Sequence, residues 1–377
     1  MFIYLAILII GYWAINIPNK YKVVLLKFYI IFLAFFLCFG YTTGSDWRVY
    51  EVVYNEMDIS SPNFFFPFEP GYMLYMYLAK LLGIEFWPFF CFTKVVLWII
   101  ISSFLIAYQK KEGFFVITFF VGLFGYMLFI DNPMRMLIAI AFYLISVSFF
   151  IKGEKRKAYF FVLLSFCFHF SSIVLYIYLN VFTKKIRTRN WIIAFALFSF
   201  LLCSKQFLYL SISNLLGFIP YIQAKLESYF LNNDNIEPKV LSVGFIIHII
   251  LFIIVLFERS KFECSKFDSL CVNSFLFFVC LYRITFILDI FARFQYFLYP
   301  FYVIFLIKLY RISSVKQKLW LGTLMIAISF YFTYTKTTAD SRYVPYTNYL
   351  IFFIEGNNMS FQERSDYNAN NSPYKPL

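Results

Sequence analysis

Long apolar segments separated by short polar loops run along nearly the whole chain. A helix needs about 20 residues to cross the hydrocarbon core of a bilayer. The candidate spans are residues 1–18, 23–40, 86–108, 114–130, 134–151, 191–210, 241–257, 269–288, 293–310 and 319–335. Residues 158–182 are also apolar, and 69–85 form an amphipathic or interfacial candidate. The pattern predicts an all-α, polytopic integral membrane protein of about 10–12 transmembrane helices.

Composition supports this class of protein. The 377 residues are 62% hydrophobic and 14% charged, against roughly 45–50% apolar and about 25% charged in ordinary soluble domains. Because a soluble fold could not bury so much apolar surface, the excess must face lipid. This excludes disulfide scaffolds, nucleic-acid modules and disordered chains.

The positive charge is concentrated in short loops between the apolar segments. The formal net charge is +13, and short basic loops normally stay cytoplasmic, so we interpret them as topology signals and expect no nucleic-acid partner. The basic loops are 19–22, 109–113, 152–157, 183–190, 258–267 and 311–318. With these loops inside, residues 41–68, 211–240 and 336–355 become outer segments of one membrane domain over 1–355. Residues 356–377 are predicted to be a polar, disordered tail.

Two segments limit this topology. Only one crossing fits between the outer segment 41–68 and the basic loop 109–113, so 69–85 cannot also span. An even number of crossings must fit in residues 158–182, which are too few for two full spans. We therefore predict a hairpin of two half-helices that meet near Phe168–Ser172; the alternative is that one of the basic loops is misplaced.

Three arginines are candidates for binding an anion. Arg135 falls in the first turn of a predicted helix, where a cation opposes the helix dipole but completes an anion site. Pairing with Asp131, or extension toward the surface, is the alternative. Arg283 and Arg293 flank Asp289 near an outward turn, and one carboxylate cannot neutralise both. The three arginines together could bind a diphosphate, although an internal Arg–Asp–Arg network remains open for the last two.

Aromatic and charged residues follow the second predicted span. Trp47 and Tyr50 would suit either an aromatic belt at the membrane interface or a sugar-binding edge, together with Asp46 and Arg48. Tyr346 is placed on the same outer surface.

Two further ionisable residues have both a structural and a functional interpretation. Glu69 is a favourable acid at a helix N-terminus. His169 lies among phenylalanines at the predicted half-helix tip, where it is either structural or able to move a proton.

Five segments resemble a known family, in the family's order. They are TGSDWRVYEVVY (43–54), FEPGYMLYMYLAKLLG (68–83), NPMRMLIAIAFYLIS (132–146), FHFSSIVL (168–175) and YVPYTNYLIF (343–352). Together they resemble the EpsG-type family of bacterial polysaccharide polymerases, which includes O-antigen polymerases of the Wzy type. Positions in its motifs are matched by Asp46, Arg48, Glu69, Arg135 and His169, whereas Arg283 and Arg293 are placed from their chemistry.

The resemblance implies a membrane glycosyltransferase in the bacterial inner membrane, with its active site toward the periplasm. Such an enzyme moves the growing glycan of an O-antigen, capsule or exopolysaccharide from undecaprenyl diphosphate to the non-reducing end of a new lipid-linked unit. Its partners would be undecaprenyl-diphosphate-linked oligosaccharides, membrane lipid and, where present, a chain-length regulator protein. We expect neither a cofactor nor a metal.

Roles for the candidate residues follow from this reaction. The acceptor hydroxyl must lose a proton, for which Asp46, Glu69 and His169 are the candidates. Arg135, Arg283 and Arg293 would stabilise the departing diphosphate. Two alternatives remain: a glycosyltransferase or ligase that uses a lipid-linked sugar, and a flippase for the same unit.

Overall fold

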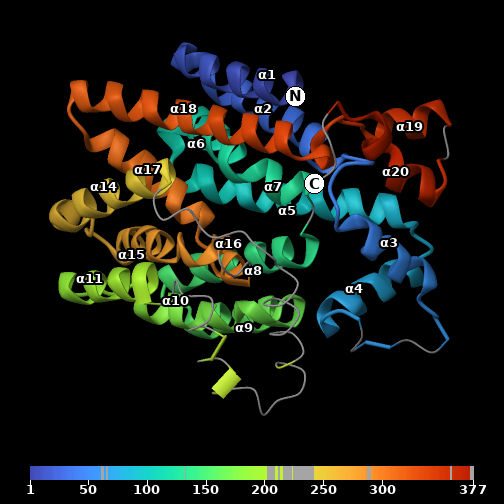
Figure 1. Ribbon diagram of the computed structural model, residues 1–377, viewed down its shortest axis with the longest axis horizontal. Coiled ribbons are helices and arrows are strands. Elements are labelled where there is room, and N and C mark those ends of the chain that lie inside the picture. The colour runs from blue at the N-terminus through green and yellow to red at the C-terminus, as the bar shows by residue number, and fades with distance from the viewer. Residues whose placement is uncertain are drawn as a thin grey trace. The chain divides into compact units, whose positions relative to one another are not determined.

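The computed structural model describes residues 1–60, 63–64, 67–131, 133–201, 209–210, 213–214, 223, 242–286, 290–356 and 359–373. Within these residues all regular structure is helical, and the one β-type contact is an isolated antiparallel bridge between Gly40 and Asn348 (Figure 1). The predicted all-α fold class is confirmed.

Among the described residues, four helices are long and apolar enough to cross a membrane. They are α2 (Asn19–Cys38), α5 (Phe86–Tyr108), the helix Lys110–Ile130 that contains α6 (Gly113–Phe120) and α7 (Tyr126–Ile130), and α8 (Met134–Ile151). They correspond to the predicted spans 23–40, 86–108, 114–130 and 134–151. The chain is therefore a polytopic membrane protein.

Two short helices connect α2 to α5. They are α3 (Trp47–Glu56) and α4 (Pro70–Leu81). At 1.5 Å per residue the 12 residues of α4 extend about 18 Å, well short of the about 30 Å hydrocarbon core. The structure thus agrees with the prediction that residues 69–85 do not add a crossing.

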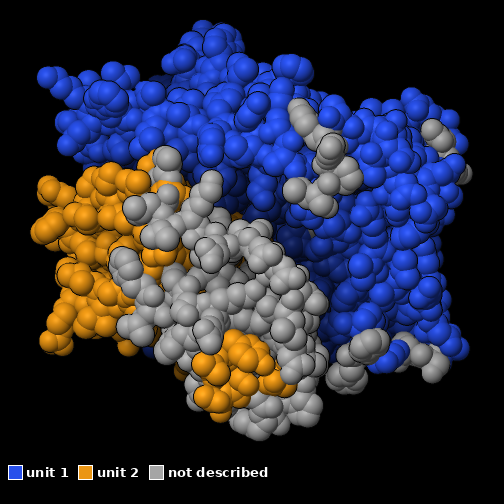
Figure 2. Space-filling model, viewed as in Figure 1, with its two compact units in different colours: residues 1–172, 306–377 blue, residues 173–305 orange. Residues whose placement is uncertain are grey.

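The chain divides into two compact units, shown in Figure 2. Unit 1, residues 1–172 and 306–377, adds α1 (Phe2–Trp13), α9 (Lys155–Phe168), α18 (Val315–Ala339), α19 (Tyr349–Glu355) and α20 (Phe361–Asn371). Unit 2, residues 173–305, contains α10 (Leu175–Val181), α11 (Thr188–Ala196), α14 (Val243–Glu258), α15 (Lys266–Leu281), α16 (Ile290–Tyr296) and the first half of α17 (Tyr299–Ile312). The predicted single domain over 1–355 contains no boundary at residues 172–173 or 305–306, where the two units meet in the sequence. Most of the predicted outer segment 211–240 lies outside the described residues.

A break in helical structure occurs where the half-helices were predicted to meet. The helix α9 ends at Phe168, and His169 has an extended backbone with φ −155° and ψ 115°. A 3₁₀ turn then covers Phe170–Val174. The backbone therefore leaves the helix at the only histidine of unit 1, which makes that residue part of an irregular segment.

Hydrogen bonds join the loop after α2 to the segment after α18. The amide of Tyr349 donates to the carbonyl of Phe39 over 2.7 Å, and the amide of Gly44 donates to the carbonyl of Arg342 over 2.9 Å. Gly44 has a φ of 84°, a conformation that costs glycine little and other residues more. Two segments about 300 positions apart in the sequence are thereby fixed beside each other.

The C-terminal residues differ from the disordered tail that we expected, because residues 361–371 form α20. Ser360 and Glu363 make a reciprocal capping box at its start. Arg364 points inward: it pairs with Glu51 over 2.5 Å and lies over the rings of three aromatic residues, Tyr41, Trp47 and Trp87. Figure 1 shows α20 at the same end of unit 1 as α3. A buried, paired arginine therefore orders a segment whose polar composition suggested disorder.

Removing the Arg364 side chain should destabilise unit 1. Both members of the Arg364–Glu51 pair are less than 10% exposed, and breaking a buried pair typically costs about 3–5 kcal/mol because one charge stays uncompensated. We expect Arg364→Ala to lower the melting temperature of the purified protein in detergent. The exposed pair Lys157–Glu154 provides the control, since Lys157→Ala should cost at most about 1 kcal/mol. Equal melting temperatures for the two variants would contradict the anchoring of α20.

Candidate functional site

Four helices of unit 1 meet around one group of polar residues. Glu69 precedes α4, Arg135 lies in the first turn of α8, and His169 follows α9. The helix α3 supplies Tyr50. A Cβ on Gly71 would lie 2.7 Å from the carbonyl oxygen of Cys167. Only glycine therefore lets the start of α4 approach the end of α9 so closely.

Arg135 and Glu69 form the centre of this group. The guanidinium nitrogen Nη1 of Arg135 is paired with the Oε2 of Glu69. Its Nε donates to the hydroxyl of Tyr50 over 3.5 Å, and its guanidinium lies 4.6 Å from the ring centre of Phe68. The Glu69 side chain is 8% exposed and that of Arg135 28%. An anion could therefore reach the arginine from solvent while the carboxylate stays behind it.

The start of α8 agrees in part with the prediction made for Arg135. The helix begins at Met134, one residue later than expected, with Pro133 before it. Arg135 lies in the first turn as predicted. Its carboxylate partner is Glu69 rather than Asp131, the partner named as the alternative.

The break after α9 gives a backbone amide to Glu69 and sets the hydrogen bonds of the neighbouring His169 imidazole. The amide of Phe170 donates to the Oε1 of Glu69 over 3.4 Å. The amide of Ser171 donates to the Nδ1 of His169 over 3.2 Å, and the Ser171 hydroxyl lies 2.7 Å from the same nitrogen. Because a backbone N–H can only donate, Nδ1 is the unprotonated nitrogen in this arrangement and Nε2 carries the hydrogen. His169 is thus set up as a hydrogen-bond donor through Nε2.

A second group of charges lies at the start of α3. The Ser45 hydroxyl is 3.2 Å from carboxylate oxygens of both Asp46 and Asp131. Arg342 contacts Asp131 at 3.4 Å and Asp340 at 2.5 Å. Burial and the nearby Asp131 carboxylate raise the pKa of Asp46 to about 6. Asp46 can therefore take up and release a proton near neutral pH.

The predicted sugar-binding residues are distributed over several contacts. Trp47 is fully buried and Tyr50 is 3% exposed. Arg48 donates to the carbonyl of Ser365 in α20 over 2.7 Å, and Tyr346 is stacked on Phe36 at 4.3 Å. Tyr50 alone among the four contacts Arg135. A sugar-binding role for Trp47, Arg48 and Tyr346 stays a prediction.

Arg283 and Arg293 belong to unit 2. Arg283 donates to the carbonyl of Ser199 over 2.7 Å and lies 5.2 Å from the ring centre of Phe245. Arg293 is in the last turn of α16, and Asp289 lies outside the described residues. That Arg135 acts together with these two arginines stays a prediction.

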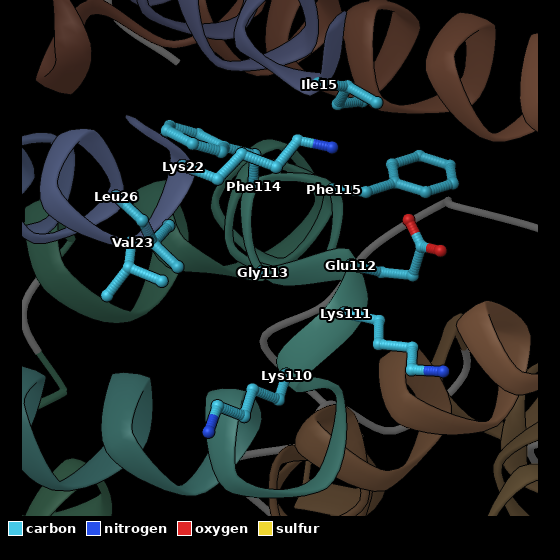
Figure 3. A pocket seen from close by; sticks show the side chains of 10 residues that line it. All are labelled: Ile15, Lys22, Val23, Leu26, Lys110, Lys111, Glu112, Gly113, Phe114 and Phe115. Carbon is cyan, nitrogen blue, oxygen red and sulfur yellow. The ribbon is translucent and has the colours of Figure 1, made fainter. Parts of the chain in front are cut away.

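A small pocket at the opposite end of the helices contains three lysines. It is formed by Lys22 at the start of α2 and by residues 110–115 before and within α6. Figure 3 shows the ammonium groups of Lys110 and Lys111 pointing away from each other. The lysines do not converge on one ligand position, so we do not assign this pocket a function.

Sequence reasoning missed three partners of the site. Arg342 lies in the predicted outer segment 336–355 and Arg364 in the predicted tail 356–377, and neither position indicates its partner. Gly71 carried no visible signal, because its importance depends on which backbone approaches it. Arg364 could have been suspected from the Ser360–Glu363 capping pattern just before it.

The carboxyl group of Asp46 should titrate within about one pH unit of 6. Carboxyl infrared bands of the purified protein, taken as the difference between wild type and Asp46→Asn, measure this directly. Removing the neighbouring like charge with Asp131→Asn should lower the pKa of Asp46, since that carboxylate disfavours its ionisation. A difference band that titrates near pH 4 in the wild-type protein would show that Asp46 is not perturbed.

Comparison with known protein families identifies a match for this chain. No curated protein and no solved structure matches the chain. The model of the EpsG family matches residues 23–348, a range that contains Asp46, Glu69, Arg135 and His169. That family is associated with polysaccharide polymerase activity. The match covers nearly the whole chain, and the protein therefore belongs to the EpsG family.

Proposed function

We propose that this protein polymerises undecaprenyl-diphosphate-linked oligosaccharide units. It transfers the growing glycan to the non-reducing end of a new lipid-linked unit, with Arg135 on the diphosphate. The observation that carries this proposal is the Arg135–Glu69 pair, held at the start of α8 beside a helix break. A partly exposed arginine at a helix N-terminus combines two features that favour an anion.

The outer side of the membrane is the proposed side of catalysis. The basic loops 19–22, 109–113 and 152–157 adjoin the ends of α2, α5 and α8 that are opposite to Arg135. The loop 311–318 likewise precedes α18, whose other end leads to Arg342. Since short basic loops favour the cytoplasm, the group around Arg135 would face away from it.

Asp46 is the proposed general base. In the reaction, the acceptor hydroxyl oxygen attacks the anomeric carbon of the donor sugar, and the bond from that carbon to the diphosphate oxygen breaks. The hydroxyl proton passes to a base, and the diphosphate leaves with the electron pair. Asp46 fits the role of base because its pKa of about 6 leaves it ionised at neutral pH yet able to accept a proton. Glu69 is engaged by Arg135, and His169 is arranged as a donor.

Arg135 then balances the charge that develops on the leaving diphosphate. Its guanidinium has five donors in a planar fork, of which Glu69 and Tyr50 engage only part. A lysine could supply the charge but not the paired hydrogen bonds. The proposal therefore predicts that charge alone does not rescue an arginine substitution.

Replacement of Arg135 should shorten the surface glycan to one repeat unit. In a deletion strain complemented with Arg135→Gln or Arg135→Lys, we expect the ladder seen on a glycan gel to collapse, because diphosphate departure is no longer stabilised. Arg311→Gln makes the same change at an exposed position in the last turn of α17 and should leave the ladder intact. Immunoblots of membranes confirm equal amounts of protein. An unchanged ladder with Arg135→Gln would refute the role of Arg135, and loss of all displayed glycan would favour a flippase.

The rate of polymerisation should follow the ionisation of Asp46. In proteoliposomes with lipid-linked units, we expect the rate to rise about tenfold per pH unit below pH 6 and to level off above it, since only the carboxylate can accept the proton. Asp46→Asn should lower the rate by about 10²–10⁴-fold and remove the acidic limb. If Asp46→Asn keeps the wild-type profile, the base is another residue.

A further inference from the structure

A cavity lies beside α3, on the side that carries Glu51. It has a volume of about 470 Å³ and is formed by α3, the turn after α4 and the start of α5. Ligand pockets commonly have volumes of about 300–1,000 Å³. We name it the α3–α5 cavity, and its lining residues used below are Glu51, Asn55, Lys80, Glu85 and Trp87.

Two residues that line this cavity each carry a buried polar atom without a partner. The Oε2 of Glu51 and the indole Nε1 of Trp87 find no hydrogen-bond partner among the residues that the structure describes. Their residues are 5% and 8% exposed. The other carboxylate oxygen of Glu51 is already engaged by Arg364. Unpaired buried polar groups are costly, and an acceptor and a donor beside one cavity together suit a hydroxyl group.

The charged groups of the cavity disfavour a phosphate as its main ligand. Lys80 donates to the carbonyls of Tyr54, Asn55 and Met57 at 2.7–2.9 Å, which uses all three donors of its ammonium group. The charge of Glu51 is balanced by Arg364, and the carboxylate of Glu85, which also lines the cavity, would repel an anion. The cavity therefore suits a ligand that is rich in hydroxyl groups and carries no phosphate.

The position of the cavity links it to the Arg135 group. Tyr50, which contacts Arg135, and Glu51, which lines the cavity, are neighbours on α3. Adjacent residues of an α-helix point about 100° apart. One short helix thus carries one residue of the anion site and one of the cavity on different sides.

We infer that the α3–α5 cavity binds phosphate-free sugar residues of the glycan, away from the reacting diphosphate end. This inference rests on the polymerase function proposed above. Glu51 would accept a hydrogen bond from a sugar hydroxyl, and the Trp87 indole would donate one. Asn55 and Glu85 at the exposed rim would contact the next ring.

Binding of phosphate-free glycan to the purified protein tests this inference. The probe is a set of oligosaccharides of one to four repeat units, released from the surface polysaccharide of the source organism and freed of lipid and phosphate. We expect calorimetric binding to the wild-type protein. Trp87→Phe keeps an aromatic ring in place but removes the N–H, and it should weaken binding about tenfold.

A pair of matched variants controls for charge and folding. Glu85→Gln removes a rim carboxylate and should weaken binding several-fold, whereas Glu56→Gln makes the same change at an exposed position of α3 that does not line the cavity. The inference would be overturned if the wild-type protein did not bind the oligosaccharides. It would also be overturned if Trp87→Phe and Glu85→Gln bound them as tightly as wild type, or if Glu56→Gln lost as much affinity as Glu85→Gln. The binding measurement uses oligosaccharides without a diphosphate. A failure to bind them is therefore distinct from a failure of the glycan-ladder experiment on Arg135.

Discussion

The ion pair between Arg135 and Glu69 fixes the geometry on which the candidate site depends. Both groups come from helix starts, and Glu69 is largely removed from solvent, so separating the pair would leave a buried charge uncompensated. Glu69 also accepts the amide of Phe170, which ties the break after α9 to the same carboxylate. Gly71 makes this approach sterically feasible. One carboxylate thereby sets the positions of α4, α8 and the irregular segment that carries His169.

Among the remaining carboxylates at this end of unit 1, Asp46 differs from Asp131, Asp340 and Glu51 because it is not paired with an arginine in the ion pairs described above. Asp131 and Asp340 face Arg342, and Glu51 faces Arg364. Asp46 is instead hydrogen-bonded by the neutral hydroxyl of Ser45 and feels the repulsion of Asp131. Because burial and repulsion act in the same direction, this carboxylate holds its proton more tightly than an exposed aspartate would. Such a shift requires the loop after α2 to be fixed against the segment after α18, which the backbone hydrogen bonds of Gly44 and Tyr349 achieve.

Hydrophobic patterning predicted the helical class and the four long spans, and the count of crossings between the basic loops predicted the short segment at residues 69–85 and the break near His169. These features depend on the length and composition of each stretch and on the order of the basic loops, both of which can be read directly from the sequence. The choice of Glu69 as the partner of Arg135, and the burial of Arg364 in an apparently polar tail, depend on contacts between positions 66 and 313 residues apart. No periodicity encodes such pairs. The prediction that Arg283 and Arg293 bind the diphosphate together with Arg135 likewise depends on a contact between distant segments. In the structure both arginines belong to unit 2.

A lipid-linked glycan is a ligand with two different chemical ends, and the two sides of α3 differ in the same way. Toward Tyr50 lies a partly exposed guanidinium with donors for an anion. Toward Glu51, the guanidinium of Arg364 is already paired with the Glu51 carboxylate, the ammonium group of Lys80 is occupied by backbone carbonyls, and Glu85 adds a carboxylate. An anionic head would be repelled from the second side and drawn to the first. A sugar chain gains hydrogen bonds on the second side without competing for Arg135. The helix α3 could therefore orient a substrate by charge, with its diphosphate at Arg135 and its sugars directed toward the cavity, before any specific sugar contact is made.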